Sequence, residues 1–410
     1  MAEALFRDVS TEAIACPDCD LVQRIPSSSQ GQDIACSRCG AFFFRHREKG
    51  LDACLSLTVA VAFLFWLAST EKFLSLSLDG RSQSAMLLSG VVELAGTGAV
   101  ALAALVFLTI FAVPLFRIGG YLYVLVPLRL GVVAPGTGPI FRWVERLREW
   151  TMLDVLLIAV IVAGVKMGEG ADVEIGNGLI AFVAMVLIWT LSREYLDSAL
   201  VWNAVAPQNA EPDEEAVGCN DCGNRVASRP GESLGRCPRC RAPLEDRKFK
   251  AFGRTMAFVL AGAVLYVPAN TLPILILTSF GKTEPQTLLG SINLLFSAGM
   301  WPIAVILFFA SILVPMLKLV GLSWLVWAAR RGSRRPLDET RLFRVIAYVG
   351  RWSMVDVLVL ALLVALVRLG NVASISPGIG ATCFAAVVVL TLFAAQSFDP
   401  RLIWDRERTS

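Results

Sequence analysis

The alternation of apolar and polar stretches predicts a protein built around membrane-spanning helices. Eight apolar runs lie near residues 51–69, 94–128, 150–166, 178–192, 255–280, 299–329, 352–368 and 378–395. A helix needs about 20 apolar residues to cross a hydrocarbon layer of about 30 Å. Each run is therefore expected to hold one span, four in each half of the chain and eight in all.

The second run of each half is longer than one span requires, and it contains Pro114 or Pro315. We expect one long helix that leaves the membrane on the cytosolic side. The alternative is a break at the proline into two shorter helices, because proline removes a backbone hydrogen bond from a helix.

The second half of the chain repeats the first. A shift of 202 positions, with a drift of one residue in places, aligns residues 150–155 with 352–357 and residues 113–117 with 314–318. Register of this kind indicates an internal duplication. The predicted fold class is an all-α polytopic membrane protein made of two four-helix membrane units, each preceded by a small cytosolic four-cysteine zinc ribbon.

Four domains follow from this repeat. They are a first zinc ribbon at 1–48, a first membrane unit at 49–206, a linker with a second zinc ribbon at 207–248, and a second membrane unit at 249–410. The linker is acidic between Pro207 and Glu215 and is expected to be a solvated connector.

The basic residues predict the orientation of the chain. Arginines collect between the second and third spans of each half, at Arg129, Arg142, Arg146 and Arg148 and again at Arg330, Arg331, Arg334, Arg335, Arg341, Arg344 and Arg351. The loops after the first and third spans carry few. Basic loops stay in the cytosol, so both ribbons and both termini are expected there.

Composition agrees with a membrane protein. Apolar residues make up 56% of the chain and charged residues 17%, which excludes an ordinary soluble protein. The net charge of +3 predicts no nucleic-acid surface. The first 15 residues have no apolar core of the length that a secretory signal needs.

Eight of the ten cysteines form four Cys-x-x-Cys pairs, two before each membrane unit. The pairs are Cys16 with Cys19, Cys36 with Cys39, Cys219 with Cys222, and Cys237 with Cys240. Two such pairs can place four thiolates around one Zn²⁺, which predicts two zinc ions per chain. A rubredoxin-like iron site and thiol chemistry are the alternatives, whereas disulfides are disfavoured in a reducing cytosol. A closed four-thiolate site leaves no position for catalysis.

Charged residues interrupt the third run of each half. Only 11 uncharged residues separate Asp154 from Lys166, and 11 separate Asp356 from Arg368. At about 1.5 Å per residue this is shorter than the hydrocarbon layer. Lysine and arginine can reach the headgroups on long side chains, whereas aspartate cannot, so the two aspartates are expected to be the buried charges.

A polar site is predicted in the second membrane unit. Counting from the far end of its second span brings Lys318 to the depth of Asp356, and Ser311 and Ser353 lie within one or two turns of them. An ion pair next to a lipid-accessible cavity, responding to a proton or a lipid headgroup, is one interpretation. A purely structural ion pair is the other.

Two further features concern the difference between the halves. Arg117 and Asp154 occupy the corresponding positions in the first half and are expected to form a structural pair. Pro268, Asn270 and Pro273 fall in the first span of the second half alone. They predict either a broken helix that exposes backbone groups to a cavity or a simple packing kink.

The paired ribbons, the Pro-Ala-Asn-x-x-Pro stretch at 268–273, the Trp-Ser-Met-x-Asp-Val stretch at 352–357 and the Ser-Phe-Asp-Pro-Arg-x-x-Trp end at 397–404 together resemble the paraquat-inducible protein A family. The resemblance covers essentially the whole chain. It implies an inner-membrane subunit of Gram-negative bacteria that accompanies an MCE-domain (mammalian cell entry) protein, whose tunnel crosses the periplasm, and that takes part in moving phospholipid. The first half departs from the pattern because it lacks the Pro-Ala-Asn stretch.

The resemblance favours a transport subunit over an enzyme. The sequence contains no Gly-x-x-x-x-Gly-Lys-Ser/Thr pattern, so we do not expect this chain to hydrolyse ATP. A membrane redox protein with iron-loaded ribbons is the main alternative, and a membrane-anchored scaffold for a cytosolic partner is another. Zinc content would separate the first two functions, and phospholipid bound within the helices would count against the third.

Overall fold

The structure is a computed structural model of the whole chain. It describes residues 13–24, 33–45, 50–78, 81–167, 172–196, 198–206, 216–227, 235–279, 282–297, 299–333, 335–366 and 373–405. The predicted linker at 207–215 and the predicted membrane-boundary residue Arg368 lie outside these ranges.

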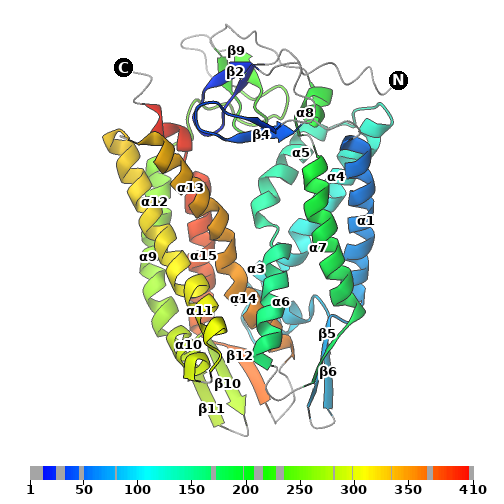
Figure 1. Cartoon of the computed structure of the whole chain (residues 1–410), viewed down its shortest axis with the longest axis vertical. Helices are drawn as coiled ribbons and strands as arrows, with labels where there is room; N and C mark the ends of the chain where they lie inside the picture. Colours follow the sequence, from blue (N-terminus) through cyan, green and yellow to red (C-terminus); the bar gives the residue numbers. More distant parts are fainter. Residues whose placement is uncertain are drawn as a thin grey trace.

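Up to its last short helix, each half of the chain has the same succession of elements (Figure 1). The first half consists of α1 (Gly50–Thr70), β5 (Leu74–Leu78), β6 (Arg81–Ala85), α2 (Ser89–Gly96), α3 (Val100–Phe107), the π-helix η2 (Leu108–Ala112), α4 (Val113–Arg129), α5 (Thr137–Arg146), the 3-10 helix η3 (Leu147–Trp150), α6 (Leu153–Met167), β7 (Asp172–Ile175), α7 (Asn177–Tyr195) and α8 (Ser198–Val205). The second half consists of α9 (Ala251–Thr271), β10 (Leu275–Ser279), β11 (Lys282–Gln286), α10 (Leu288–Ser297), α11 (Trp301–Phe308), the π-helix η4 (Phe309–Leu313), α12 (Val314–Arg331), α13 (Pro336–Gly350), the 3-10 helix η5 (Arg351–Met354), α14 (Val355–Leu366), β12 (Ala373–Pro377), α15 (Ile379–Ser397) and the 3-10 helix η6 (Pro400–Ile403).

Seven helical segments of the described chain are long and apolar enough to cross a membrane. They are Gly50–Thr70, Val100–Arg129, Asn177–Tyr195, Ala251–Thr271, Ala304–Arg331, Pro336–Leu366 and Ile379–Ser397. The chain is thus a multi-pass membrane protein. The eighth predicted span corresponds to α6, which has 15 described residues, packs against its counterpart α14 and runs along the same bundle (Figure 1).

The long second span of each half stays continuous through its proline. The helix widens into a π-helix just before Pro114 and again just before Pro315. A proline ring clashes with the carbonyl four residues earlier, and a π-turn moves that carbonyl away. The prediction of one long helix is confirmed, although α2 and α10 form separate short helices before it.

A small antiparallel sheet closes one end of each half, and the sequence did not predict it. Strand β5 lies between β6 and β7, and β10 lies between β11 and β12. The hairpin follows the first span, and the third strand follows the third span. Figure 1 shows both sheets at the end opposite the ribbons, so the strands tie the first and third spans together.

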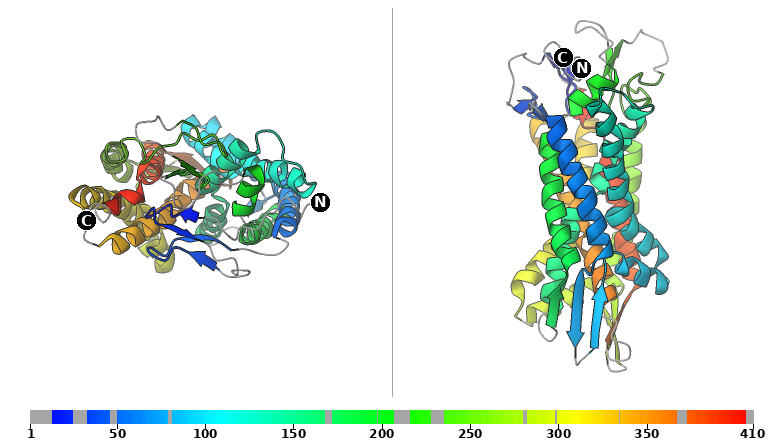
Figure 2. Two further views of the ribbon diagram at one scale, coloured as in Figure 1. Left: turned by 90° about the horizontal axis from the view of Figure 1, so that it is seen from above. Right: turned by 90° about the vertical axis from the view of Figure 1, so that its right-hand side faces the viewer.

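The two halves stand side by side (Figure 2), and they meet along their third spans. Within each half the first span packs on the fourth, α1 on α7 and α9 on α15. Between halves α14 packs against α6 and α2, and every residue of α14 except Asp356 is buried. A Cβ atom at Gly90 of α2 would lie 2.6 Å from the Ala361 carbonyl oxygen, so this contact requires glycine.

Two ribbons lie at the end of the bundle opposite the sheets (Figure 1). The first ribbon pairs β1 (Ala13–Ala15) with β2 (Val22–Arg24) and β3 (Asp33–Ala35) with β4 (Phe42–Arg45). The second pairs β8 (Ala216–Gly218) with β9 (Arg225–Ala227) and has a single bridge between Arg236 and Pro243. Both ribbons therefore occupy the end that carries the arginine-rich loops, as the repeat predicts.

Candidate functional site

The first ribbon gathers four buried cysteine sulfurs into one cluster. The Sγ atoms of Cys16 and Cys39 are 3.5 Å apart, as are those of Cys19 and Cys36, and all four lie within 4.8 Å of one another. Tetrahedral Zn²⁺ with sulfur at about 2.3 Å requires sulfurs about 3.8 Å apart. These distances fit one metal ion and exceed the length of a disulfide bond.

The second ribbon repeats this geometry. Sγ of Cys219 lies 3.5 Å from that of Cys240, and Sγ of Cys222 lies 3.6 Å from that of Cys237. All four side chains are buried and none forms a disulfide. Two closed four-cysteine clusters can therefore each hold a metal ion, and the chemistry they would supply is structural, because no ligand position stays open.

All four Cys-x-x-Cys pairs turn in the same way. The residue after each pair has a left-handed backbone, with φ of 61° at Asp20, 67° at Gly40, 69° at Gly223 and 58° at Arg241. Its backbone N–H donates to the carbonyl of the first cysteine of the pair. Glycine adopts this conformation without strain, so Gly40 and Gly223 were the sequence signal for these turns.

The first ribbon docks on the second half of the chain. Arg344 of α13 donates from Nε to the carboxylate of Asp18 (2.8 Å), from Nη1 to the Cys39 carbonyl (3.0 Å) and from Nη2 to the Cys39 sulfur (3.2 Å). The guanidinium of Arg38 lies 4.3 Å from the ring centre of Trp404. The four cysteines also share an apolar cluster with second-half helices.

The second ribbon docks on the first half in return. Arg142 of α5 donates from Nη1 to the Cys240 carbonyl (3.1 Å), the same contact that Arg344 makes 202 residues later. Arg239 donates to the Ala206 carbonyl (2.7 Å). A Cβ atom at Gly138 would lie 2.3 Å from the Arg239 carbonyl oxygen, so glycine permits this approach. Sequence reasoning missed the exchange, although the repeated arginines were visible.

Lys318 lies buried in the second half, 2% exposed. Its ammonium donates to the carbonyl of Gly350, the last residue of α13 (3.1 Å), and to the hydroxyl of Thr391 on α15 (2.8 Å). Thr391 was not predicted, because an isolated threonine in an apolar run gives little signal. These contacts join α12, α13 and α15 at one point.

The other predicted members of this site lie on neighbouring elements. The hydroxyls of Ser311 in η4 and Ser353 in η5 are buried and have no hydrogen-bond partner among the described residues. Asp356 lies half-buried in the first turn of α14. Most buried hydroxyls in proteins are hydrogen-bonded, so these two are unusual among the described residues. An ion pair between Lys318 and Asp356 stays a prediction.

Arg117 occupies the corresponding position in the first half and is fully buried. Its guanidinium donates to the Val144 carbonyl (3.0 Å), the Thr151 hydroxyl (2.9 Å) and the Tyr121 hydroxyl (3.1 Å). The side chain of Asp154, the predicted partner, is exposed on the described structure. The expected Arg117–Asp154 pair is corrected accordingly: Arg117 is held by neutral acceptors, and the Asp154 side chain lies on the protein surface.

The predicted break in the first span of the second half does not occur. Helix α9 continues through Pro268 to Thr271, and Pro273 lies beyond its end. The Asn270 side chain donates to the Tyr266 carbonyl (2.8 Å), and the Tyr266 hydroxyl donates to the Ile312 carbonyl in η4 (3.1 Å). Pro268 cannot donate to the carbonyl four residues earlier, yet α9 is continuous through it, which contradicts the broken-helix interpretation.

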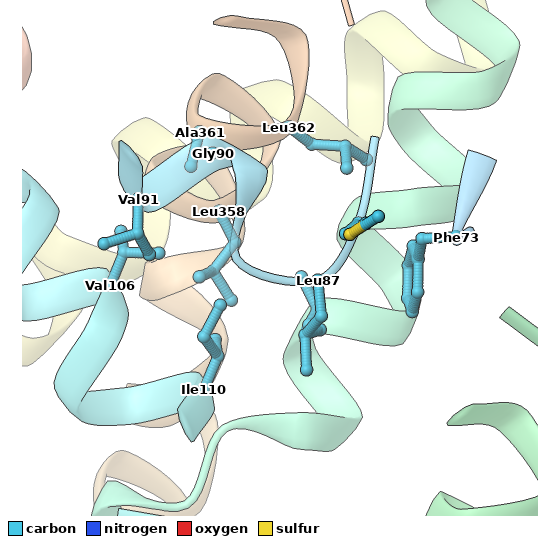
Figure 3. Close-up of a pocket in the computed structure, with 11 residues that line it drawn as sticks. Phe73, Leu87, Gly90, Val91, Val106, Ile110, Leu358, Ala361 and Leu362 are labelled. Atoms are coloured by element: carbon cyan, nitrogen blue, oxygen red, sulfur yellow. The ribbon is translucent and has the colours of Figure 1, made fainter. Parts of the chain in front are cut away.

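An apolar cavity lies between the two halves, beside α14 (Figure 3). Its lining includes Phe73, Gly90 and Ile110 from the first half and Leu358 and Leu362 from the second. The cavity volume is about 20 Å³, which is about the space of one water molecule. It is a packing gap, too small for a lipid chain.

Comparison with known proteins identifies the family of the chain. The model of the family described as paraquat-inducible protein A matches residues 51–206 and 252–408, one match in each half. The chain is 31% identical to the intermembrane transport protein PqiA of Escherichia coli (strain K12) over 97% of this chain and 96% of that protein. It is 32% identical to the lipophilic envelope-spanning tunnel protein A of the same strain, over 95% and 90%. No solved structure matches. The chain belongs to the paraquat-inducible protein A family.

Proposed function

We propose that this chain is the inner-membrane subunit of an intermembrane lipid transport system and handles phospholipid at the base of a periplasmic tunnel formed by an MCE-domain partner. The names of its relatives, an intermembrane transport protein and an envelope-spanning tunnel protein, support transport between membranes. The arginine-rich loops support an orientation with both ribbons and both termini in the cytosol. The sheets of each half would then face the periplasmic partner.

The observation that carries the proposal is the polar site of the second half. Lys318 is a buried cation with two hydrogen-bonded neighbours, and the hydroxyls of Ser311 in η4 and Ser353 in η5 are buried without a partner among the described residues. Ionisable groups inside membrane proteins mark substrate or proton pathways. Asp356 completes the site in this proposal as the charge partner of Lys318, whereas the Asn270 amide is engaged with the Tyr266 carbonyl of its own helix.

The variant Lys318→Ala tests the proposal. Transfer of a radiolabelled phospholipid from the inner to the outer membrane should be lost in a Gram-negative host that lacks its own family members, while the abundance of the chain stays normal. The double variant Lys318→Asp with Asp356→Lys should not restore transfer. If Lys318 and Asp356 form a purely structural pair, Lys318→Ala should instead lower the stability by about 3–5 kcal/mol and reduce the amount of folded protein. The double variant should then restore part of that loss.

We further propose that the metal in both ribbons is zinc, at two ions per chain. The closed thiolate sets favour a structural ion over a reactive one. Metal analysis of the purified chain should give two zinc ions and no visible absorption. An iron content near two per chain, with the colour of ferric thiolate, would favour the redox alternative.

A further inference from the structure

Arg142 and Arg344 stand at equivalent positions of the two halves, and each contacts the ribbon that precedes the other half. We propose that Arg344, in the second half, is a positioning residue for the metal centre of the first ribbon, more than 300 residues away in sequence, and that it sets how firmly this centre retains its metal. The proposal rests on the four-cysteine clusters holding a metal ion.

The contacts of Arg344 fit this role. Four thiolates around a divalent ion carry a net charge of −2, which a nearby cation compensates. Nη2 of Arg344 donates to the Cys39 sulfur (3.2 Å), while Nη1 holds the carbonyl of the same cysteine (3.0 Å). The ion pair between Nη2 and the Asp18 carboxylate (2.7 Å) fixes the guanidinium in place. Donors to ligand atoms orient the ligands and tune metal affinity.

The second ribbon provides the comparison. Arg142 reaches the Cys240 carbonyl (3.1 Å), and the described sulfur contact of that ribbon comes from the neutral side-chain amide of Asn224, which approaches the Cys237 sulfur at 3.9 Å. A charged donor at 3.2 Å is much stronger than a neutral one at 3.9 Å. The donor of the second centre belongs to the ribbon itself, whereas the donor of the first centre belongs to a helix of the opposite half.

The two centres should therefore respond differently to changes in the membrane helices. Loss of the Arg344 guanidinium should loosen the first centre and leave the second intact. Because Arg344 lies on α13, a helix of the second half, the first ribbon should be affected rather than the ribbon that directly precedes this half in sequence.

The test uses the zinc-loaded full-length chain and measures, by mass spectrometry, how fast N-ethylmaleimide labels each cysteine in the presence of a chelator. Arg344→Ala should raise the labelling rate of Cys16, Cys19, Cys36 and Cys39 by about 10- to 100-fold, the usual effect of removing a donor to a metal ligand. The cysteines of the second ribbon should keep their rate. Arg341→Ala, an exposed arginine one turn earlier on the same helix, is the matched control and should change neither.

Cys54 and Cys383, which lie in α1 and α15, report general unfolding in the same experiment. If Arg344→Ala also raises the labelling of these two cysteines, the variant Arg344→Lys is used instead. Lysine keeps a cation near Asp18 but lacks the guanidinium donors that contact Cys39, so the cysteines of the first ribbon should be labelled at an intermediate rate. The proposal is overturned if the first ribbon keeps its wild-type rate in both variants, or if both ribbons become labelled equally while Cys54 and Cys383 stay protected.

Discussion

Equivalent positions in the two halves carry different buried cations, Arg117 in the first half and Lys318 in the second, and the two side chains are held differently. Arg117 has a planar guanidinium with several N–H donors, and three of its nitrogens each donate to a different acceptor. Lysine at 318 has a compact ammonium with a flexible chain, held by one carbonyl and one hydroxyl. A lysine can change its partners at lower cost, which is why the second half is the place to expect movement.

Thr391→Val tests the role of the hydroxyl that accepts from Lys318. The variant leaves a buried ammonium short of one acceptor, so stability should fall by about 1–3 kcal/mol, and phospholipid transfer should drop more than tenfold. Thr190→Val in α7 is the control, because the Thr190 hydroxyl donates to the Val186 carbonyl of its own helix (2.9 Å). Equal transfer by the two variants would contradict a special role for Thr391.

Asp399 gives a prediction about pH. Burial would raise the pKa of this carboxyl, but hydrogen bonds from Arg401 and the charge of that residue outweigh it and hold the pKa below its usual 3.8. A depressed pKa means that the pair stabilises the fold above pH 3.8 and that this contribution is lost as the pH falls below that value.

Asp399→Asn should therefore destabilise the detergent-solubilised chain by about 3–5 kcal/mol at pH 7, because it leaves Arg401 buried without its charge partner. The gap between variant and wild type should shrink below pH 4 in thermal unfolding followed by helix content. A gap independent of pH would show that the loss comes from packing.

At the scale of elements, the helices were predictable and their ends were not. Apolar runs of about 20 residues fix spans such as α1 and α9, because only a helix satisfies its own backbone in lipid. The hairpin of β5 and β6 was overlooked although Leu74–Leu78 alternates leucine and serine and Asp79-Gly80 follows it. The pairing of β5 with β7 escaped prediction because it joins segments about 100 residues apart. Thr391 and the exchanged ribbons escaped for the same reason, since their partners are set by tertiary contacts.

The π-helix before Pro315 makes a prediction at this scale. Pro315→Ala removes the ring that clashes with the Ser311 carbonyl, so an ordinary α-helix becomes possible. If the π-helix became an α-helix, Ser311 would turn about the helix axis relative to Lys318 by about the angle of one residue. Transfer should fall while the thermal midpoint stays equal or rises. Pro114→Ala changes the same feature in the first half and should leave transfer intact; loss in both variants would indicate a purely structural π-helix.

At the scale of the whole molecule, the exchange of ribbons ties the halves together. Helix α13 contacts the first ribbon through Arg344 and, at its end, presents the Gly350 carbonyl to Lys318. Helix α5 repeats this arrangement, with Arg142 on the second ribbon and the Val144 carbonyl on Arg117. Each buried cation is therefore linked through one short helix to the ribbon that lies before the other half in the chain.

Removing one metal centre should consequently weaken the half that its ribbon touches. Metal contributes on the order of 10 kcal/mol to folding of such ribbons, so Cys16→Ser should unfold the first ribbon, lower the abundance of the chain and take away the contacts on α13. Cys219→Ser should do the same for the second ribbon and α5.

Amide hydrogen exchange on the remaining folded protein in detergent distinguishes the two helices. Faster exchange in α13 with Cys16→Ser, and in α5 with Cys219→Ser, is the expected result. The opposite assignment, in which each variant loosens the membrane helices that follow it in sequence, would mean that connection along the chain, rather than contact across the halves, carries the effect of the metal.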